Sequence, residues 1–104
     1  MSVAVVLAAA GSGSRMGAPG NKVLLSLDGK PVLSHSLDCF SVMDEVCELV
    51  VVTREVDRQA VSELVHQAVP DKKTQVVLGG ASRQDSVYLG LLALTTPAEW
   101  IVIH

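Results

Sequence analysis

The residue types best suited to chemistry gather in a glycine-rich segment, Ala9 to Gly17, which directly follows the first apolar run. Glycines let a backbone approach a phosphate closely, and successive N–H groups can form an anion-binding nest. Arg15 adds a planar, permanently charged guanidinium that matches phosphate oxygens. Lys22 follows seven residues later, across a flexible Gly/Pro stretch. The spacing therefore allows both cations to converge on one phosphate chain.

Two common phosphate-binding motifs do not describe this segment. A Walker A loop ends in Gly-Lys-Ser/Thr, whereas the pair Gly29 and Lys30 is followed by Pro31. The dinucleotide fingerprint requires a third glycine at the position of Met16. From spacing alone, a plain glycine-rich turn with a solvated arginine and lysine remains an alternative interpretation.

A second candidate segment runs from Gly79 to Val87, between an apolar run and a helical pattern. A helix N-terminus presents free N–H groups, which favour polar or anionic ligands. Ser86 is placed to hydrogen bond the edge of a nucleobase. Ser82 and Asp85 have the spacing of a capping box variant, in which the serine hydroxyl caps the helix. The alternative is an ordinary strand-to-helix turn whose Asp85 serves only as a cap.

The remaining residues must supply the elements that position these two segments. Apolar runs predict strands at 3–8, 46–53, 74–78 and 100–104. Apolar residues at helical spacing predict helices in the intervals between them, and Thr53 is expected to cap the helix that follows its strand. Strands that alternate with helices define an α/β protein with a mostly parallel sheet. Ligands bind beyond the carboxyl ends of strands in such sheets, which is where both segments fall.

Composition limits the function classes. The chain of 104 residues is 49% hydrophobic and 18% charged, which favours a single folded domain, 1–104, over disorder. Aromatic residues are only 3%, so valine, leucine and alanine must form the core, with Tyr88 and Trp100 as packing residues. The net charge of −3 provides no basic field for nucleic acid. No apolar stretch is long enough for a membrane span, and Cys39 and Cys47 are interpreted as reduced thiols of a cytosolic protein.

The two segments together resemble the 2-C-methyl-D-erythritol 4-phosphate cytidylyltransferase family. The first has the pattern Ala-Ala-Gly-x-Gly-x-Arg-Met with a following lysine, and the second has Gly-Gly-x-x-Arg-x-x-Ser-Val. The first pattern is similar to sugar-nucleotide pyrophosphorylases in general, whereas the second is far more specific. The resemblance runs from Val3 to His104. It implies a three-layer, Rossmann-like nucleotidyltransferase fold, of which this chain would be the N-terminal portion.

The resemblance also implies roles for individual residues. Arg15 and Lys22 match the family's catalytic cations at the transferring phosphate. The positions that match its nucleotide-binding residues are Ala8, Ala9, Ala10, Gly11, Gly13, Gly80, Ala81 and Ser86. Ala8 departs from the proline that many members carry, which changes the stiffness of the backbone there. No residue of this chain matches a metal ligand, because the family's metal-binding aspartate follows the position of His104.

The implied reaction is transfer of a cytidylyl group from CTP to 2-C-methyl-D-erythritol 4-phosphate, with Mg²⁺ as cofactor and pyrophosphate as the leaving group. It belongs to non-mevalonate isoprenoid synthesis, in the bacterial cytoplasm or the plastid stroma. The sugar-phosphate site and a dimerisation arm belong to the family's other half. We therefore expect a truncated chain without transferase activity of its own, and a homodimer for the complete enzyme. The alternatives are another sugar-phosphate nucleotidyltransferase of the same fold and a domain that only binds nucleotide.

Overall fold

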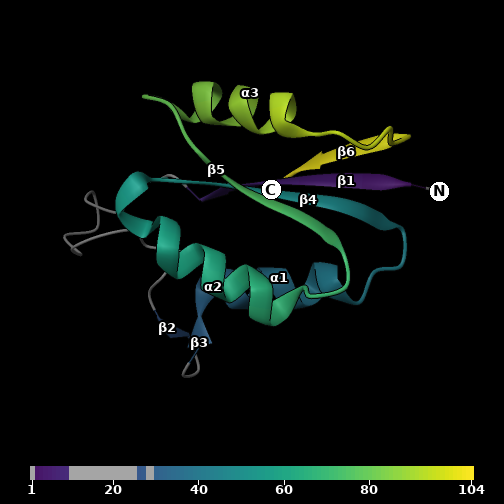
Figure 1. The fold of residues 1–104 in the computed structure, drawn as a ribbon, viewed down its shortest axis with the longest axis horizontal. Helices are drawn as coiled ribbons and strands as arrows, with labels where there is room; N and C mark the ends of the chain where they lie inside the picture. The colour runs from purple at the N-terminus through teal and green to yellow at the C-terminus, as the bar shows by residue number, and fades with distance from the viewer. Residues whose placement is uncertain (1, 10–25, 28–29) are drawn as a thin grey trace.

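The computed structural model describes residues 2–9, 26–27 and 30–104, in which strands alternate with helices (Figure 1). The main elements are β1 (Val3–Ala9), α1 (Val32–Ser41), β4 (Val46–Thr53), α2 (Arg58–Ala68), β5 (Lys73–Leu78), α3 (Arg83–Ala93) and β6 (Trp100–Ile103). The short strands β2 (Ser26–Leu27) and β3 (Lys30–Pro31) pair with each other, and a 3-10 turn, η3 (Glu55–Asp57), precedes α2. The strands and helices predicted from apolar periodicity are confirmed.

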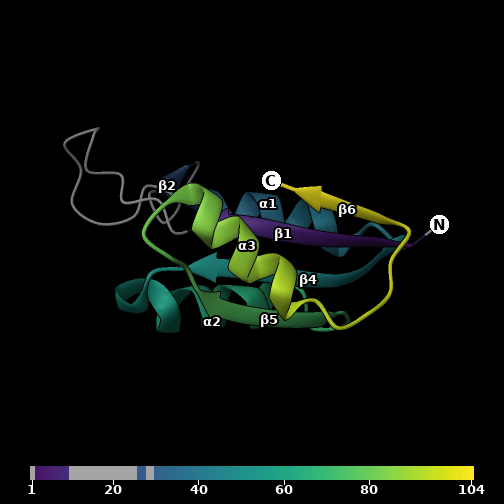
Figure 2. The same ribbon diagram turned by 90° about the horizontal axis from the view of Figure 1, so that it is seen from above.

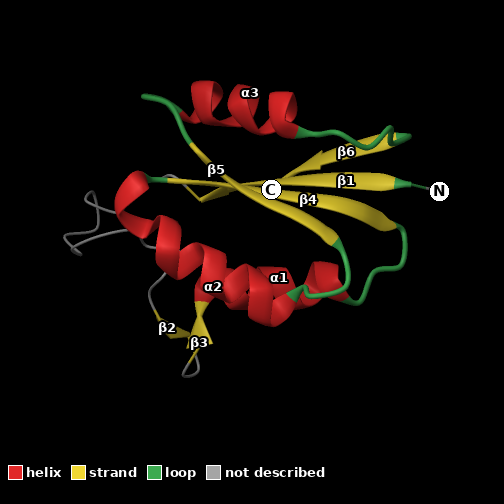
Figure 3. Ribbon diagram, in the orientation of Figure 1, coloured by secondary structure: helices red, strands yellow, loops and turns green. Residues whose placement is uncertain are grey.

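The central sheet is parallel throughout the described chain. Its strand order is β5-β4-β1-β6, and each neighbouring pair runs in the same direction. Helices α1 and α2 cover one face and α3 covers the other, as Figure 3 shows. The predicted three-layer α/β arrangement is therefore confirmed. Because both faces of the sheet are covered, β1 and β4 are nearly continuous runs of apolar residues.

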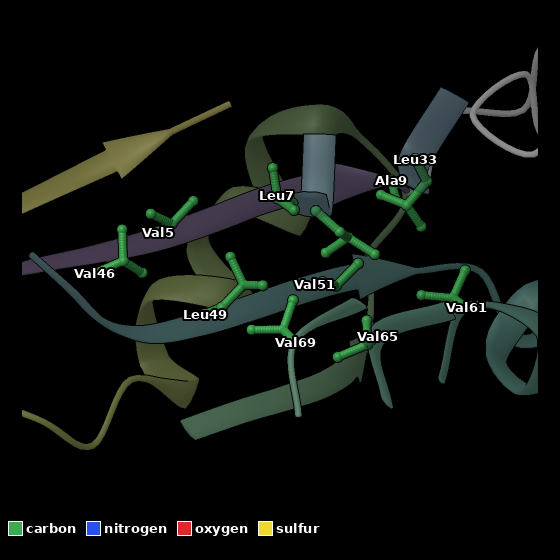
Figure 4. Close-up of a cluster of buried hydrophobic side chains, with 11 residues drawn as sticks. Val5, Leu7, Ala9, Leu33, Val46, Leu49, Val51, Val61, Val65 and Val69 are labelled. Atoms are coloured by element: carbon green, nitrogen blue, oxygen red, sulfur yellow. The ribbon is translucent and has the colours of Figure 1, made fainter. Parts of the chain in front are cut away.

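Strand side chains alternate between two cores. The core beneath α1 and α2, shown in Figure 4, consists of Val5, Leu7, Ala9, Leu33, Leu37, Val46, Leu49, Val51, Val61, Val65 and Val69. On the other face, α3 packs on Val6, Val50 and Val52. Gly90 makes this approach possible, because a Cβ there would lie 2.6 Å from a methyl carbon of Val6 and 2.9 Å from one of Val52.

Three expectations about single residues are wrong. Thr53 does not cap the following helix, because the η3 turn separates them and Arg54 instead pairs with Asp57 (Nε to Oδ2, 2.8 Å). The Thr53 hydroxyl is buried and has no hydrogen-bond partner among the described residues. Tyr88 and Trp100 are each 61% exposed rather than packed. Tyr88 is exposed because α3 buries other positions, Ser86 and Gly90, against the sheet. Trp100 is exposed because it lies on β6, at the edge of the sheet.

Candidate functional site

The candidate site lies at the carboxyl edge of the sheet. The register pairs Ala9 with Thr53 and Thr53 with Leu78, so β1, β4 and β5 end side by side. Two strand spacings, or about 10 Å, separate the ends of β1 and β5. The N–H of Gly79 donates to the Thr53 carbonyl at 2.9 Å, which carries the parallel pairing one residue past β5. Both segments suggested by the sequence therefore start from this edge.

Ser86 ties the turn between β5 and α3 together. Its hydroxyl is buried and accepts a hydrogen bond from the Gly80 N–H at 3.2 Å. One helical turn earlier, the Ser82 hydroxyl accepts from the Asp85 N–H at 3.1 Å, which confirms Ser82 as the helix cap. Two hydrogen bonds therefore fasten this turn to the beginning of α3.

Gly80 fits this turn because it has no side chain. A Cβ at this position would lie 2.6 Å from the Cβ of Asp85, closer than two non-bonded carbon atoms can approach. Gly80 and Ala81 are both exposed, so the turn presents backbone and a single methyl group to its surroundings. A ligand can thus approach the main chain here without displacing a large side chain.

The electrostatics of the turn are mixed. The first N–H groups of a helix lack intrahelical partners, and the helix dipole places partial positive charge there. The Ser82 hydroxyl accepts a hydrogen bond from the Asp85 N–H, so this donor is already satisfied. The Asp85 side chain also brings a negative charge into the first turn of the helix. The Ser86 hydroxyl, after accepting from Gly80, keeps its own proton for donation. The turn can therefore present hydrogen-bond donors to a polar group such as a nucleobase edge.

The end of β1 supplies the other described part of the site. Ala8 is partly exposed, Ala9 is buried, and both lie in register with the end of β4. The Ala8 N–H donates to the His104 carbonyl at 3.0 Å, and the His104 N–H donates to the Val6 carbonyl at 2.9 Å. The His104 ring meets Phe40 edge-on, with 5.8 Å between ring centroids. These contacts hold His104 against β1 close to the end of that strand.

The structure thus places Ala8, Ala9, Gly80, Ala81 and Ser86 at the same edge of the sheet. The other site residues suggested by the sequence lie outside the described residues, and they are Ala10, Gly11, Gly13, Arg15 and Lys22. Their roles stay predictions.

A metal ion would find few protein ligands in the described chain. No group of three or more histidine, cysteine, aspartate or glutamate side chains is gathered among the described residues. Near the carboxyl edge, Asp57 is paired with Arg54. Magnesium typically uses one or two carboxylates together with substrate phosphates and water, so a dedicated protein cage is not required.

Among the described helices, none combines the length and apolarity that crossing a bilayer would need.

A buried carboxylate at the opposite edge of the sheet escaped the sequence analysis. Glu48 lies on β4 beneath the end of α3, and its carboxylate accepts from the N–H groups of Thr95 and Thr96 at 3.0 and 2.8 Å. It also accepts from the side-chain amide of Gln75 at 3.2 Å. The sequence offered one signal for this network, a single charged residue within an otherwise apolar strand. A carboxylate buried at such a position needs several hydrogen-bond donors.

These hydrogen bonds decide the charge state of Glu48. Burial alone would raise its pKa, because an ionised carboxylate loses its hydration. The donors from Thr96, Thr95 and Gln75 outweigh burial and hold the pKa below its ordinary value. Glu48 is therefore ionised at neutral pH and fixes the connection between α3 and β6.

The parallel sheet, with helices on both faces and a turn of small residues at its carboxyl edge, places this protein in the α/β class. The family model for 2-C-methyl-D-erythritol 4-phosphate cytidylyltransferase matches residues 3–104. The chain belongs to this family.

Curated relatives support the assignment. The 2-C-methyl-D-erythritol 4-phosphate cytidylyltransferase of Parasynechococcus marenigrum (strain WH8102) is 42% identical over 100 residues, which cover 96% of this chain and 43% of the relative. The protein of the same name from Prochlorococcus marinus (strain MIT 9313) is also 42% identical, with 96% and 44% covered. The chain therefore spans less than half the length of these relatives.

Solved structures agree on the fold. The 4-diphosphocytidyl-2C-methyl-D-erythritol synthase from Anaerococcus prevotii DSM 20548 superposes with a TM-score of 0.81 at 26% identity, covering 99% of this chain and 42% of that one. The inositol-1-phosphate CTP transferase from T. maritima superposes with a TM-score of 0.70 at 22% identity, covering 99% and 43%. At that identity, the second likeness bears on the fold alone.

Proposed function

We propose that this chain forms the CTP-binding part of an enzyme that transfers a cytidylyl group to 2-C-methyl-D-erythritol 4-phosphate. The observation that carries the proposal is the family match over residues 3–104, which includes the turn that Gly80 and Ser86 close at the carboxyl edge. The name of the family supplies the nucleotide and the acceptor. Magnesium, the sugar phosphate and a homodimeric complete enzyme are parts of the same proposal.

The transfer is an in-line displacement at the α-phosphorus of CTP. A phosphate oxygen of the sugar forms the new P–O bond as the bond to the pyrophosphate leaving group breaks, and the bonding electrons leave with pyrophosphate. The nucleophile is already an anion, so no strong base is needed. Catalysis then consists of positioning and charge stabilisation. Magnesium, when bound, would act as a Lewis acid that offsets the charge of the phosphate oxygens.

Arg15 and Lys22 are assigned to the phosphate chain. In this proposal the guanidinium of Arg15 and the ammonium of Lys22 neutralise charge that grows on the α-phosphate and the leaving group. Ala8, Ala9, Ala10, Gly11 and Gly13 supply the loop around the nucleotide. Their small side chains support this role, because a nucleotide can then approach the main chain closely.

Gly80, Ala81 and Ser86 are assigned to the cytosine. The support is local: Gly80 and Ala81 leave the backbone exposed, and the Ser86 hydroxyl keeps a proton while bracing Gly80. Such a small turn favours a pyrimidine over a bulkier purine. Loss of a buried hydrogen-bond partner for a base typically costs about 1–3 kcal/mol, enough for a clear preference.

Binding of nucleotides to the chain tests the first half of the proposal. Calorimetry with CTP, UTP and GTP, each with magnesium, should show CTP binding about tenfold or more tightly than GTP. UTP is the finer control, because it differs from CTP only on the base edge. Equal affinity for CTP and GTP would refute the assignment of the turn to cytosine.

Kinetics test the second half, in a full-length enzyme that carries this chain's sequence. Arg15→Lys and Lys22→Ala should lower kcat by about 10²–10³, which corresponds to roughly 3–4 kcal/mol, and should raise KM for CTP less. Lysine is a poor substitute at position 15 because a point charge cannot replace a bidentate fork. A near-normal kcat at saturating CTP in both variants would contradict the catalytic role and would leave the two residues with a role in phosphate binding alone.

A further inference from the structure

The strand in the middle of the candidate site is β4, which lies between β1 and β5 in the sheet (Figure 2). Ala9, Thr53 and Leu78 are in register at the ends of these three strands. The ends of β1 and β5 are about 10 Å apart, so they leave room for a ligand between them. A nucleotide base that binds the turn after β5 and reaches toward β1 must therefore lie across the end of β4.

Arg54 is the first residue beyond β4 whose side chain reaches the surface. Thr53 is fully buried, whereas the side chain of Arg54 is 27% exposed. The Arg54 backbone is still extended, with φ −77° and ψ 156°, and the η3 turn begins at the next residue. Because the Gly79 N–H donates to the Thr53 carbonyl at 2.9 Å, the peptide that joins Thr53 to Arg54 lies beside Gly79. Arg54 is therefore a neighbour of the turn that contains Gly80.

Asp57 fixes the guanidinium of Arg54. The Arg54 Nε–H donates to the Asp57 Oδ2 at 2.8 Å, and the Asp57 side chain is only 11% exposed. This contact uses one of the N–H donors that an arginine carries. Among the described residues, no acceptor is bonded to the donors on the two terminal Nη atoms. The side chain is therefore held in place while its terminal donors stay available.

The ion pair also decides which part of a nucleotide suits this side chain. The Asp57 carboxylate offsets the charge of the guanidinium, and Glu55 adds a negative charge at the position after Arg54. A phosphate gains less from an arginine that is already paired, because the neighbouring carboxylate repels it. A neutral, planar group with hydrogen-bond acceptors avoids this repulsion and matches the planar fork of donors. The base of a nucleotide is such a group.

We propose that the terminal N–H groups of Arg54 donate to the base of CTP at its two adjacent acceptors, O2 and N3, and thereby select cytosine against uracil. The inference rests on the proposed function, to which it adds a specificity-determining residue. Arginine reads two acceptors of one base in the same bidentate way in the grooves of DNA. O2 has two lone pairs, so the Ser86 hydroxyl can donate to it as well. Uracil carries a hydrogen on N3 and so presents a donor to a donor, which rejects it.

Calorimetry with CTP and UTP measures this selection, because the two nucleotides have the same ribose and phosphates. With magnesium, the unaltered chain should bind CTP about tenfold or more tightly than UTP. Arg54→Gln should weaken CTP binding by about the same factor and leave UTP binding nearly unchanged, so that the preference disappears. Arg54→Lys keeps a positive charge beside Asp57 but should also lose the preference, since an ammonium cannot supply two parallel donors.

Arg58→Gln is the matched control. Arg58 is exposed at the start of α2, and its replacement removes the same charge close to Arg54. This variant should keep both affinities, because Arg58 does not adjoin the turn that contains Gly80. Thermal melts of each variant show that it is folded, and Arg54→Lys supplies the test if the loss of the ion pair unfolds Arg54→Gln.

Three results would overturn the inference and leave CTP binding intact. The first is an unchanged ratio of CTP to UTP affinity in both Arg54 variants. The second is an equal loss for both nucleotides, which would assign Arg54 to the ribose or the phosphates. The third is equal binding of CTP and UTP by the unaltered chain. If the unaltered chain binds neither nucleotide, the inference and the proposed function fail together.

Discussion

Helix α3 begins at the carboxyl edge of the sheet and ends at the amino edge, and its two ends use polar groups differently. At the first end, the exposed Gly80 and Ala81 leave the main chain open, and Ser86 braces the turn with one hydrogen bond. At the second end, the buried carboxylate of Glu48 collects donors from Thr95, Thr96 and Gln75. The first end is exposed and built from small residues, whereas the second end is fixed by a buried carboxylate that accepts several hydrogen bonds.

Under the proposed function, the difference separates a structural role at one end of the helix from a ligand-binding role at the other. A fully satisfied buried network fixes a single arrangement, and losing one member leaves several donors unpaired. A turn built from small residues keeps hydrogen-bonding capacity for a ligand and tolerates little added volume. Substitutions at the Glu48 end should therefore act on stability, whereas substitutions at the Gly80 end should act mainly on nucleotide binding.

The largest effect on stability is expected at the saturated end. Glu48→Ala removes the acceptor of the Thr95 and Thr96 N–H groups and one of the two acceptors of the Gln75 side-chain amide, and it leaves a cavity. The free energy of unfolding should fall by about 3–5 kcal/mol, measured by urea denaturation. Glu45→Ala is the control at an exposed position nearby and should stay within about 0.5 kcal/mol. Equal effects of the two substitutions would contradict the structural role of Glu48.

Two glycines of this region allow the same substitution to be compared. Gly90→Ala places a methyl group against Val6 and Val52, so stability should fall by about 1–3 kcal/mol, partly offset by alanine's better helix propensity. Gly80→Ala forces the turn away from Asp85 and should weaken CTP binding more than it lowers stability. Melting curves and CTP calorimetry on both variants measure the two effects. If the loss of CTP affinity relative to the loss of stability were the same in Gly90→Ala and Gly80→Ala, the proposed binding role of Gly80 would be contradicted.

Ser82 and Ser86 make a finer comparison. Ser82→Ala removes the helix cap and should cost about 1 kcal/mol of stability. Ser86→Ala leaves the Gly80 N–H without its acceptor and removes the hydroxyl assigned to the base, so CTP affinity should fall about tenfold or more. A larger loss of CTP affinity in Ser82→Ala than in Ser86→Ala would move the ligand away from Ser86.

The smallest effect concerns pH. The pKa of Glu48 is lowered on folding, so the unfolded chain takes up its proton first as the pH falls. The stability contributed by ionised Glu48 is complete above the ordinary pKa of about 4.5 and is lost as the pH falls through the lower folded value. Urea denaturation between neutral and acidic pH should show a shallower loss in Glu48→Gln than in the unaltered chain. Parallel pH profiles would mean that Glu48 is not held ionised.

Local signals in the sequence were sufficient for the elements and for one end of α3. Apolar runs and helical spacing predicted β4, α2 and their neighbours, because each pattern is complete within one element. The cap by Ser82 was predictable since its donor lies only three residues away. The proximity of Gly80 and Ser86 also follows from a single turn, six residues apart.

Nonlocal features were not predictable in the same way. The partners of Glu48 lie 27 to 48 residues away in sequence, so only its presence in an apolar strand hinted at the network. The exposure of Trp100 depends on strand order, because β6 falls at the edge of the sheet. Thr53 was misassigned since an extra 3-10 turn delays the helix. Arg15 and Lys22 lie outside the described residues, so their convergence on a phosphate chain stays a prediction.

Amide chemical shifts of this 104-residue chain during titration with CTP and magnesium test the division between the two ends of α3 most directly. At the two ends of α3, the account predicts large shifts at Gly79, Gly80, Ala81 and Ser86, little change at Thr95 and Thr96, and a much weaker response to GTP. Shifts at Thr95 and Thr96 as large as those at Gly80, or the same response to GTP as to CTP, would contradict it.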